Sequence, residues 1–162
     1  MLFRSQFDIQ YCEEPVAHWD NDGLATVRRN SPVPIMADES VFDHHDAYRL
    51  AKAGAVDYIN IKLAKSGGIH TALKINAVAE AAGIPCMLGG MFETRIGISA
   101  GAHLIAACPN IVFADLDSIN HYAEDPVIGG VVFDGPKVAL PDTPGHGAEI
   151  MDEFIEKEYS LT

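Results

Sequence analysis

The chain has 162 residues, 48% of them hydrophobic, and a formal net charge of −12 at pH 7. This length fits one domain or part of a larger one, and the acidic balance argues against nucleic acid or an anionic membrane as a partner, because both are bound by basic patches. The three cysteines lack zinc-like spacing and residues 1–8 contain no long apolar stretch, so we expect a cytoplasmic protein without a signal peptide or membrane span.

Five short apolar segments recur along the first 115 residues and are typical of buried strands. They start about every 24 to 27 residues and cover 9–12, 34–37, 58–61, 85–88 and 111–114. Helical patterns fill the intervals at 22–29, 69–82 and 96–107. A further helix is predicted between an N-cap at Asp43 and a terminator at Gly54. Short buried strands that alternate with helices indicate a parallel sheet, because parallel strands need a crossover connection.

This α/β pattern fits either a doubly wound sheet or part of an eight-fold barrel. Neither GxGxxG nor GxxxxGK[ST] occurs, which removes the main signals for a nucleotide-binding sheet. Beyond Asp117 the alternation stops. We expect a turn and a strand in 126–133, an irregular segment rich in Pro and Gly in 141–147, and a short terminal helix or acidic tail in 151–158.

Polar side chains stand directly after each predicted strand. They are Glu13, Asp38, Lys62, a Gly89-Gly90 pair with Glu93 nearby, and Asp115 with Asp117. The carboxyl ends of parallel strands meet at one edge of a sheet, so we expect these side chains to converge there. Grouped carboxylates repel one another unless a cation neutralises them, and oxygen ligands suit Mg²⁺ or Mn²⁺ rather than zinc.

Lys62 is the basic residue in this series. A metal ion beside a lysine disfavours the ammonium form, so the pKa of Lys62 is expected to fall from about 10.4 towards the working pH, where the amine acts as a general base. Two simpler interpretations stay open from the residues alone. Acids of this kind also cap helix N-termini, and a lysine at the rim of a sheet also extends into water.

Four strings carry a resemblance to a known family: CEEPV at 12–16, MADES at 36–40, IKLAKSGGI at 61–69 and FETRIG at 92–97. In this order and spacing they resemble the muconate-lactonizing branch of the enolase superfamily, over most of the chain. Within that branch, Asp115-Leu-Asp117 is similar to the DxD motif of dipeptide epimerases of the L-Ala-D/L-Glu type. The resemblance implies the C-terminal portion, about strands 4–8, of a (β/α) TIM-type barrel.

The resemblance also implies roles for the first strand ends. Glu13 and Asp38 would bind Mg²⁺, with Mn²⁺ as the alternative, whereas Glu14 stands where many relatives carry Gln and is not expected to be a ligand. Lys62 would be an acid/base catalyst on one face of the substrate, and Lys65 would support it by charge. The implied reaction is epimerisation of a dipeptide, by abstraction of a proton next to a metal-bound carboxylate and through an enediolate.

Substrate binding is implied for the later strand ends. Asp115 and Asp117 would hold the α-ammonium of a dipeptide or another small carboxylate substrate, and Glu93 would order the rim beside them. A quaternary ammonium would instead be held by aromatic faces, yet the only tryptophan, Trp19, follows the first strand. The pair of aspartates therefore favours a substrate with a free ammonium group.

By the same resemblance, residues 1–125 form a partial barrel and 126–162 a segment that returns to a capping domain. The capping domain, the first three strands, a third metal ligand and a second base have no counterpart in the chain. We therefore expect a fragment that does not epimerise alone. The alternatives are assembly with a separate N-terminal piece and a homo-oligomer that closes the barrel, since an unpaired apolar strand edge favours pairing.

Other functions stay open from the sequence. Within the branch they are a muconate-type cycloisomerase, an o-succinylbenzoate synthase/N-acylamino acid racemase and an epimerase of amino-acid betaines. A different class is a non-catalytic fragment that binds a metal or a partner. A histidine metal site is disfavoured, because His44 and His45 are adjacent rather than one helical turn apart and the other histidines are scattered.

Overall fold

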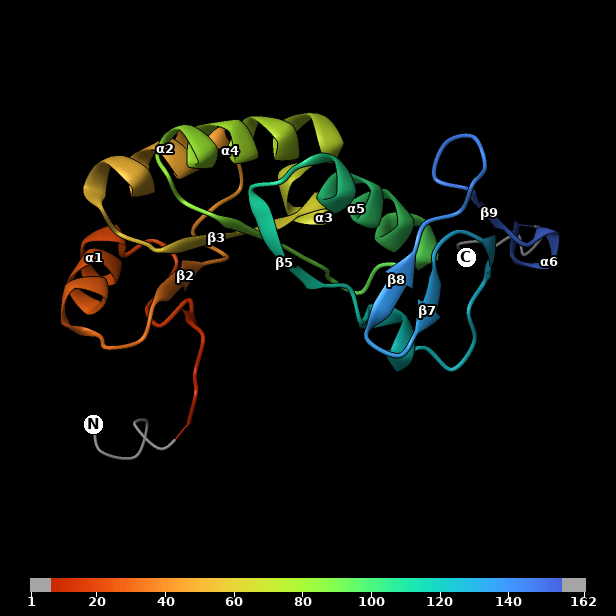
Figure 1. The fold of residues 1–162 in the computed structure, drawn as a ribbon, viewed down its shortest axis with the longest axis horizontal. Coiled ribbons are helices and arrows are strands. Elements are labelled where there is room, and N and C mark those ends of the chain that lie inside the picture. The colour runs from red at the N-terminus through yellow and green to blue at the C-terminus, as the bar shows by residue number, and fades with distance from the viewer. Residues whose placement is uncertain (1–6, 156–162) are drawn as a thin grey trace, which may run out of the picture.

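The computed structural model describes residues 7–155, and its centre is a five-stranded parallel sheet (Figure 1). The strands are neighbours in chain order: β1 (Cys12–Glu13), β2 (Ile35–Ala37), β3 (Tyr58–Lys62), β4 (Cys86–Gly89) and β5 (Ile111–Asp115). Four longer helices alternate with them: α1 (Asn21–Asn30), α2 (His44–Ala53), α4 (Ile69–Ala81) and α5 (Arg95–Ala107). The predicted α/β alternation is confirmed. No helix in 7–155 combines the length and the apolar character needed to cross a membrane.

Side-chain caps determine where the helices begin. The Asp43 carboxylate accepts hydrogen bonds from the backbone N–H groups of His45 and Asp46, and the Asp46 carboxylate accepts one from the Asp43 N–H, which completes a capping box for α2. Gly54 ends this helix in the left-handed conformation, with φ 58°. The start of α1 lies one residue earlier than predicted, because the Asp20 carboxylate caps its first turn.

The first strand is shorter than predicted and lies later in the chain. It comprises Cys12 and Glu13, and residues 9–11 precede it. The neighbouring strand begins at Ile35, directly after Pro34, which has no backbone N–H to donate to a ladder. The Cys12 N–H donates to the Pro34 carbonyl at 2.8 Å, and this bond marks the start of the pairing.

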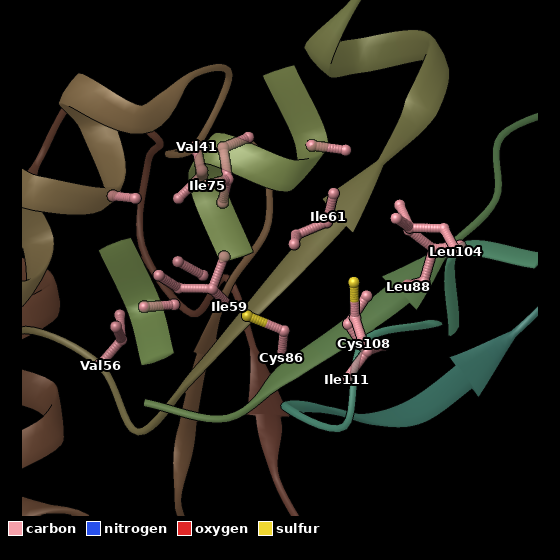
Figure 2. Close-up of a cluster of buried hydrophobic side chains, with 14 of the residues drawn as sticks. Val41, Val56, Ile59, Ile61, Ile75, Cys86, Leu88, Leu104, Cys108 and Ile111 are labelled. Carbon is pink, nitrogen blue, oxygen red and sulfur yellow. The ribbon is translucent and has the colours of Figure 1, made fainter. Parts of the chain in front are cut away.

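The hydrophobic core lies between the sheet and helices α1, α2, α4 and α5, and Figure 2 shows part of it. Ile59 and Ile61 of β3, Leu88 of β4 and Ile75 of α4 all belong to it and are almost completely buried. Each such side chain stabilises the fold by about 1.5–3 kcal/mol relative to an exposed position. Because successive strand residues point to opposite faces, the residues of β3 that alternate with these isoleucines face the other side of the sheet.

The C-terminal part departs from the single strand that we predicted in 126–133. This stretch holds two strands, β6 (Val127–Gly129) and β7 (Val132–Asp134), which pair antiparallel with β9 (Ala148–Ile150) and β8 (Lys137–Ala139) respectively. Gly129 and Gly130 have φ values of 73° and 77°, so the chain turns between the strands in a conformation that suits glycine. Segment 141–147 is irregular, as predicted. Helix α6 (Asp152–Ile155) covers the described part of the predicted terminal element, and 156–158 lie outside the described residues.

Cys86, in the middle of the core, is predicted to resist alkylation in the folded protein. Its side chain is buried and burial raises its pKa to about 12, so about one thiol in 10,000 is ionised at pH 8. We expect iodoacetamide to modify the partly buried Cys12 first, and Cys86 only after unfolding in guanidinium chloride, as measured by peptide mass spectrometry. Equal modification of both cysteines in the native protein would contradict the burial of β4.

Candidate active site

The carboxyl edge of the sheet brings together four side chains that the sequence analysis singled out. Glu13 ends β1, Asp38 follows β2, Lys62 ends β3 and Lys65 lies in the short helix α3 (Leu63–Ser66). The Lys62 ammonium lies 2.5 Å from Asp38 Oδ2, and the Lys65 ammonium lies 2.7 Å from Asp38 Oδ1. The parallel strands thus place these groups in contact although the lysines follow Asp38 by more than 20 residues in the chain.

Asp38 is the buried centre of this cluster. Its side chain is 5% exposed, and each carboxylate oxygen accepts a hydrogen bond from a lysine ammonium. Burial alone would raise the pKa of Asp38, but the hydrogen bonds and charges of Lys62 and Lys65 outweigh burial and hold this pKa below its usual value. Asp38 is therefore an anion at neutral pH, as both an ion-pair partner and a metal ligand must be.

The two lysines differ in the direction of their pKa shifts. Burial lowers the pKa of both, and at Lys65, whose side chain is 6% exposed, burial outweighs the attraction of Asp38. At Lys62, whose side chain is 17% exposed, the hydrogen bond to Asp38 outweighs burial and the pKa lies above its usual value. The lowered pKa that we predicted for Lys62 requires a metal ion beside it, whereas these directions follow from the protein groups alone, so it stays a prediction.

Glu13 stands at the exposed rim of the same cluster. Asn60 Nδ2, on β3, donates a hydrogen bond of 2.6 Å to Glu13 Oε1. Loss of water on the side that faces the cluster raises the pKa of Glu13, the hydrogen bond from Asn60 opposes this rise, and the negative charge of Asp38 adds to it. A cation placed between Glu13 and Asp38 would relieve this repulsion.

Glu14 holds the loop that carries Asp38, a role that the sequence did not reveal. Its φ of 39° is positive, which is uncommon for a residue with a side chain. Its carboxylate accepts hydrogen bonds from the backbone N–H groups of Asp38 at 2.6 Å and Ser40 at 3.2 Å, and from the Ser40 hydroxyl. The oxygens of Glu14 are thus used for the loop, in line with the expectation that it is not a metal ligand.

Asp115 and Asp117 lie on the other side of Lys62. The register pairs Lys62 with Gly89 of β4, and Gly89 with Asp115 of β5, so these three residues stand at one level of the sheet. Loss of water raises the pKa of Asp115, and the negative charge of Asp117 adds to this rise. The two aspartates therefore form a second centre of negative charge along the same edge.

Lys62 and Asp117 both line a hollow of about 290 Å³. The other residues that line it are Gly90, Met91, Phe92, Ser118 and His121. Met91 and Phe92 are exposed, so an apolar wall stands next to the charged groups. This lining suits a small molecule that carries charged groups as well as an uncharged part.

Glu93 does not join the charged cluster through its side chain. The carboxylate turns towards Gly97 in the first turn of α5, and its Oε1 is buried without a hydrogen-bond partner among the described residues. The backbone carbonyl of Glu93 accepts a hydrogen bond of 3.1 Å from the Ser118 hydroxyl. Glu93 thus contacts the segment after Asp117 through its backbone.

Two residues of α5 that the sequence analysis did not single out attach the C-terminal segment. The Arg95 guanidinium forms an ion pair with Asp125 and donates to the Gly129 carbonyl at 3.2 Å. The Ser99 hydroxyl accepts a hydrogen bond of 3.0 Å from the Val131 N–H. The FETRIG string includes Arg95, but its partner lies 30 residues later and no local pattern connects the two.

The carboxylates of Glu13 and Asp38 have the oxygen donors that Mg²⁺ prefers. These two carboxylates could fill two positions in the coordination shell of Mg²⁺. The resemblance implied the same number of protein ligands for this chain. Within 7–155, no group of three or more His, Cys, Asp or Glu side chains is arranged to hold a metal ion. His44 and His45, whose ring centres lie 4.2 Å apart, are likewise part of no such group.

Residues 1–154 match the family described as Enolase C-terminal domain-like. The chain belongs to this family. The five parallel strands are accordingly part of a (β/α) TIM-type barrel, as predicted. The resemblance to the enolase superfamily that the four strings carried is therefore confirmed.

The named relatives are epimerases. The L-Ala-D/L-Glu epimerase of Clostridium acetobutylicum is 47% identical over 141 residues, which cover 87% of this chain and 39% of the relative. The hydrophobic dipeptide epimerase of Enterococcus faecalis is 50% identical over 145 residues, which cover 88% of this chain and 41% of the relative. The chain thus spans about two fifths of the length of these curated relatives.

A solved structure of a dipeptide epimerase has the same fold. The enzyme is from Cytophaga hutchinsonii, and its crystal structure is a complex with Mg and the dipeptide D-Ala-L-Val. It superposes with a TM-score of 0.89 at 38% identity, over 93% of this chain and 41% of the other. The similarity therefore extends over nearly all of the sheet and helices described above.

Replacing Glu14 is predicted to separate its hydrogen-bonding role from its charge. Glu14→Ala leaves the N–H groups of Asp38 and Ser40 without an acceptor, which costs about 1–3 kcal/mol for each. Glu14→Gln keeps a carbonyl oxygen for both donors, and its amide can donate to the Ser40 hydroxyl, so we expect nearly the wild-type free energy of unfolding. Urea unfolding followed by circular dichroism measures both variants. Equal losses would contradict the role of Glu14 as an acceptor.

Proposed function

We propose that the chain carries one side of the active site of a Mg²⁺-dependent dipeptide epimerase. The observation that carries this proposal is the Asp38 carboxylate, held between the ammonium groups of Lys62 and Lys65 with Glu13 beside it. These groups lie at the carboxyl edge of a parallel sheet, where barrel enzymes place their chemistry. The relatives are named as an L-Ala-D/L-Glu epimerase and a hydrophobic dipeptide epimerase, and a similar dipeptide epimerase was solved with Mg and a dipeptide.

Glu13 and Asp38 are the residues that would hold the magnesium ion. Both offer carboxylate oxygens, and the two lysines keep Asp38 ionised. When bound, the ion would polarise a substrate carboxylate and make the neighbouring C–H proton more acidic. We assign its further ligands to the substrate and to water, and the third protein ligand that the resemblance implies has no counterpart in this chain.

Lys62 is the residue that would move the substrate proton. Its ammonium is the more exposed of the two, and it lines the same hollow as Asp117. Lys65 donates to Asp38 and to the Asn60 carbonyl at 3.1 Å, so it would support the site by its charge rather than by touching substrate. Epimerisation also needs a second acid/base group on the opposite face, for which, by the resemblance, the chain has no counterpart.

Asp115 and Asp117 would bind the α-ammonium of the dipeptide. Asp117 lines the same hollow as Lys62, and Asp115 shares the level of Lys62 in the sheet. A bound ammonium would relieve the loss of water and the mutual repulsion that raise the pKa of Asp115. Met91 and Phe92 would contact the uncharged part of the substrate.

An epimerase of amino-acid betaines is the second candidate. Phe92 is the observation that favours it, because this exposed ring stands in the hollow next to Asp117 and packs edge-on against His121, with the ring centres 6.3 Å apart. Cycloisomerase, o-succinylbenzoate synthase and N-acylamino acid racemase activities use substrates without a free ammonium group. The negative charge of Asp115 and Asp117 would attract no group of such a substrate.

Lys62→Ala tests the reaction itself. We expect the exchange of the substrate α-proton for deuterium to slow by about 10²–10⁴-fold, because the variant lacks the group that transfers the proton. The exchange is followed by NMR in D₂O with Mg²⁺ and a set of dipeptides. Lys52→Ala, at an exposed position of α2, is the matched control and is expected to exchange at the wild-type rate. Undiminished exchange in Lys62→Ala would overturn the assignment.

Asp115→Asn and Asp117→Asn test how the substrate is held. Each is expected to raise KM for dipeptides with a free ammonium group by roughly 10-fold or more, because a charge-assisted hydrogen bond is lost. N-trimethylated analogues distinguish the betaine alternative, since their binding would depend on Phe92 more than on the aspartates. Asp142→Asn, at an exposed position in 141–147, is the control. An unchanged KM in both aspartate variants would contradict ammonium binding at this pair.

A further inference from the structure

Asn60 occupies a position where an apolar residue would be expected. It lies between Ile59 and Ile61 in the central strand β3, and it is 1% exposed. Its side-chain Oδ1 is buried and has no hydrogen-bond partner among the described residues. A buried amide with half of its hydrogen-bonding capacity unused destabilises a fold, so its presence calls for a function.

The NH₂ group of the Asn60 amide forms a hydrogen bond within the charged cluster. Asn60 Nδ2 donates to Glu13 Oε1 at 2.6 Å, and within 7–155 it is the one group that donates a hydrogen bond to this carboxylate. The backbone carbonyl of Asn60 accepts a hydrogen bond of 3.1 Å from Lys65, which also binds Asp38. Asn60 therefore touches both halves of the cluster, the Glu13 half through its side chain and the Asp38 half through its backbone.

Gly89 provides the room that Asn60 needs. A Cβ atom at this position would lie 2.6 Å from Asn60 Oδ1 and 2.8 Å from Nδ2, both too close for non-bonded atoms. Gly89 ends β4 with ordinary strand geometry, since it is absent from the glycines with positive φ. Space for the Asn60 amide, rather than backbone conformation, therefore accounts for glycine at this position.

We propose that Asn60 is a positioning residue that aims the Glu13 carboxylate at a divalent cation, and that Gly89 is required to leave its amide in place. The proposal rests on the function proposed above. Glu13 is exposed at the strand end and lacks the lysine partners that fix Asp38, so the hydrogen bond from Asn60 is what restricts its rotamers. Partners of this kind orient a ligand before the cation arrives and typically contribute 10–100-fold to metal affinity.

The test measures binding of Mn²⁺, used as the probe for Mg²⁺, by the electron paramagnetic resonance signal of the free ion. Asn60→Ala is expected to weaken binding by about 10–100-fold. Asn76→Ala is the matched control, because Asn76 is also a buried asparagine. Its Oδ1 accepts a hydrogen bond of 3.4 Å from Asn110 Nδ2, away from the cluster. The control is expected to bind Mn²⁺ like the wild type, and thermal unfolding without metal reports the stability of both variants.

Gly89→Ala provides a second test that leaves Asn60 and Glu13 unchanged. The added methyl group would displace the Asn60 amide, so we expect weaker Mn²⁺ binding, similar to that of Asn60→Ala. The double variant Asn60→Ala/Gly89→Ala is expected to bind no more weakly than Asn60→Ala alone, because the group that the methyl displaces is absent. Such non-additivity is the signature of two residues that act through one contact.

The outcomes separate this inference from the proposed function. If the wild type shows no saturable Mn²⁺ binding, or if Glu13→Gln leaves the affinity unchanged, the metal site itself is wrong and the inference falls with it. If the wild type binds and Glu13→Gln weakens binding, but Asn60→Ala binds like the wild type, the inference alone is overturned. Equal weakening in Asn60→Ala and Asn76→Ala would also overturn it, because the loss would then follow general destabilisation.

Discussion

The site depends on one buried interaction, in which the Asp38 carboxylate accepts hydrogen bonds from the ammonium groups of Lys62 and Lys65. Asp38 and Lys65 are almost fully enclosed, so neither would remain ionised without the opposite charge beside it. Removing one partner of such a pair costs about 3–5 kcal/mol, because an uncompensated charge is left behind. The two ammonium groups already stabilise the Asp38 anion, and a divalent cation that binds Asp38 would replace part of that stabilisation.

The same interaction explains why β1, β2 and β3 must keep their register. Asp38 is tied to the end of β1 by Glu14, which accepts from its N–H, and to the end of β3 by Lys62. The hydrogen bond from Asn60 to Glu13 connects β3 to the end of β1, so the ends of all three strands are linked to one another. A shift of one residue in β3 would turn Asn60 and Lys62 into the hydrophobic core and bring two isoleucines to the charged edge. The alternation along β3 thus specifies the core and the site together.

The positions of the strand ends could be predicted from the sequence, and the contacts between them could not. Parallel strands at a regular interval place whatever follows them at one edge, which is why Asp38 and Lys62 could be grouped. Asn60 lies 47 residues from Glu13, and Glu14 lies 24 residues from Asp38, and no local pattern encodes such hydrogen bonds. The opposite pKa shifts of the two lysines were equally hidden, because they depend on how deeply each ammonium is buried beside the same carboxylate.

The charge along the edge bears on the class of ligand. Two ammonium groups share this edge with six carboxylates, which leaves an excess of four negative charges when all are ionised. The carboxylates are those of Glu13, Glu14, Asp38, Glu39, Asp115 and Asp117. One divalent cation would halve this excess, and a zwitterionic dipeptide would then bind without adding negative charge. A dicarboxylate would instead bring negative charge towards Asp115, whose pKa is already raised by loss of water and by Asp117. The electrostatics of the edge therefore favour a ligand that carries its own ammonium group.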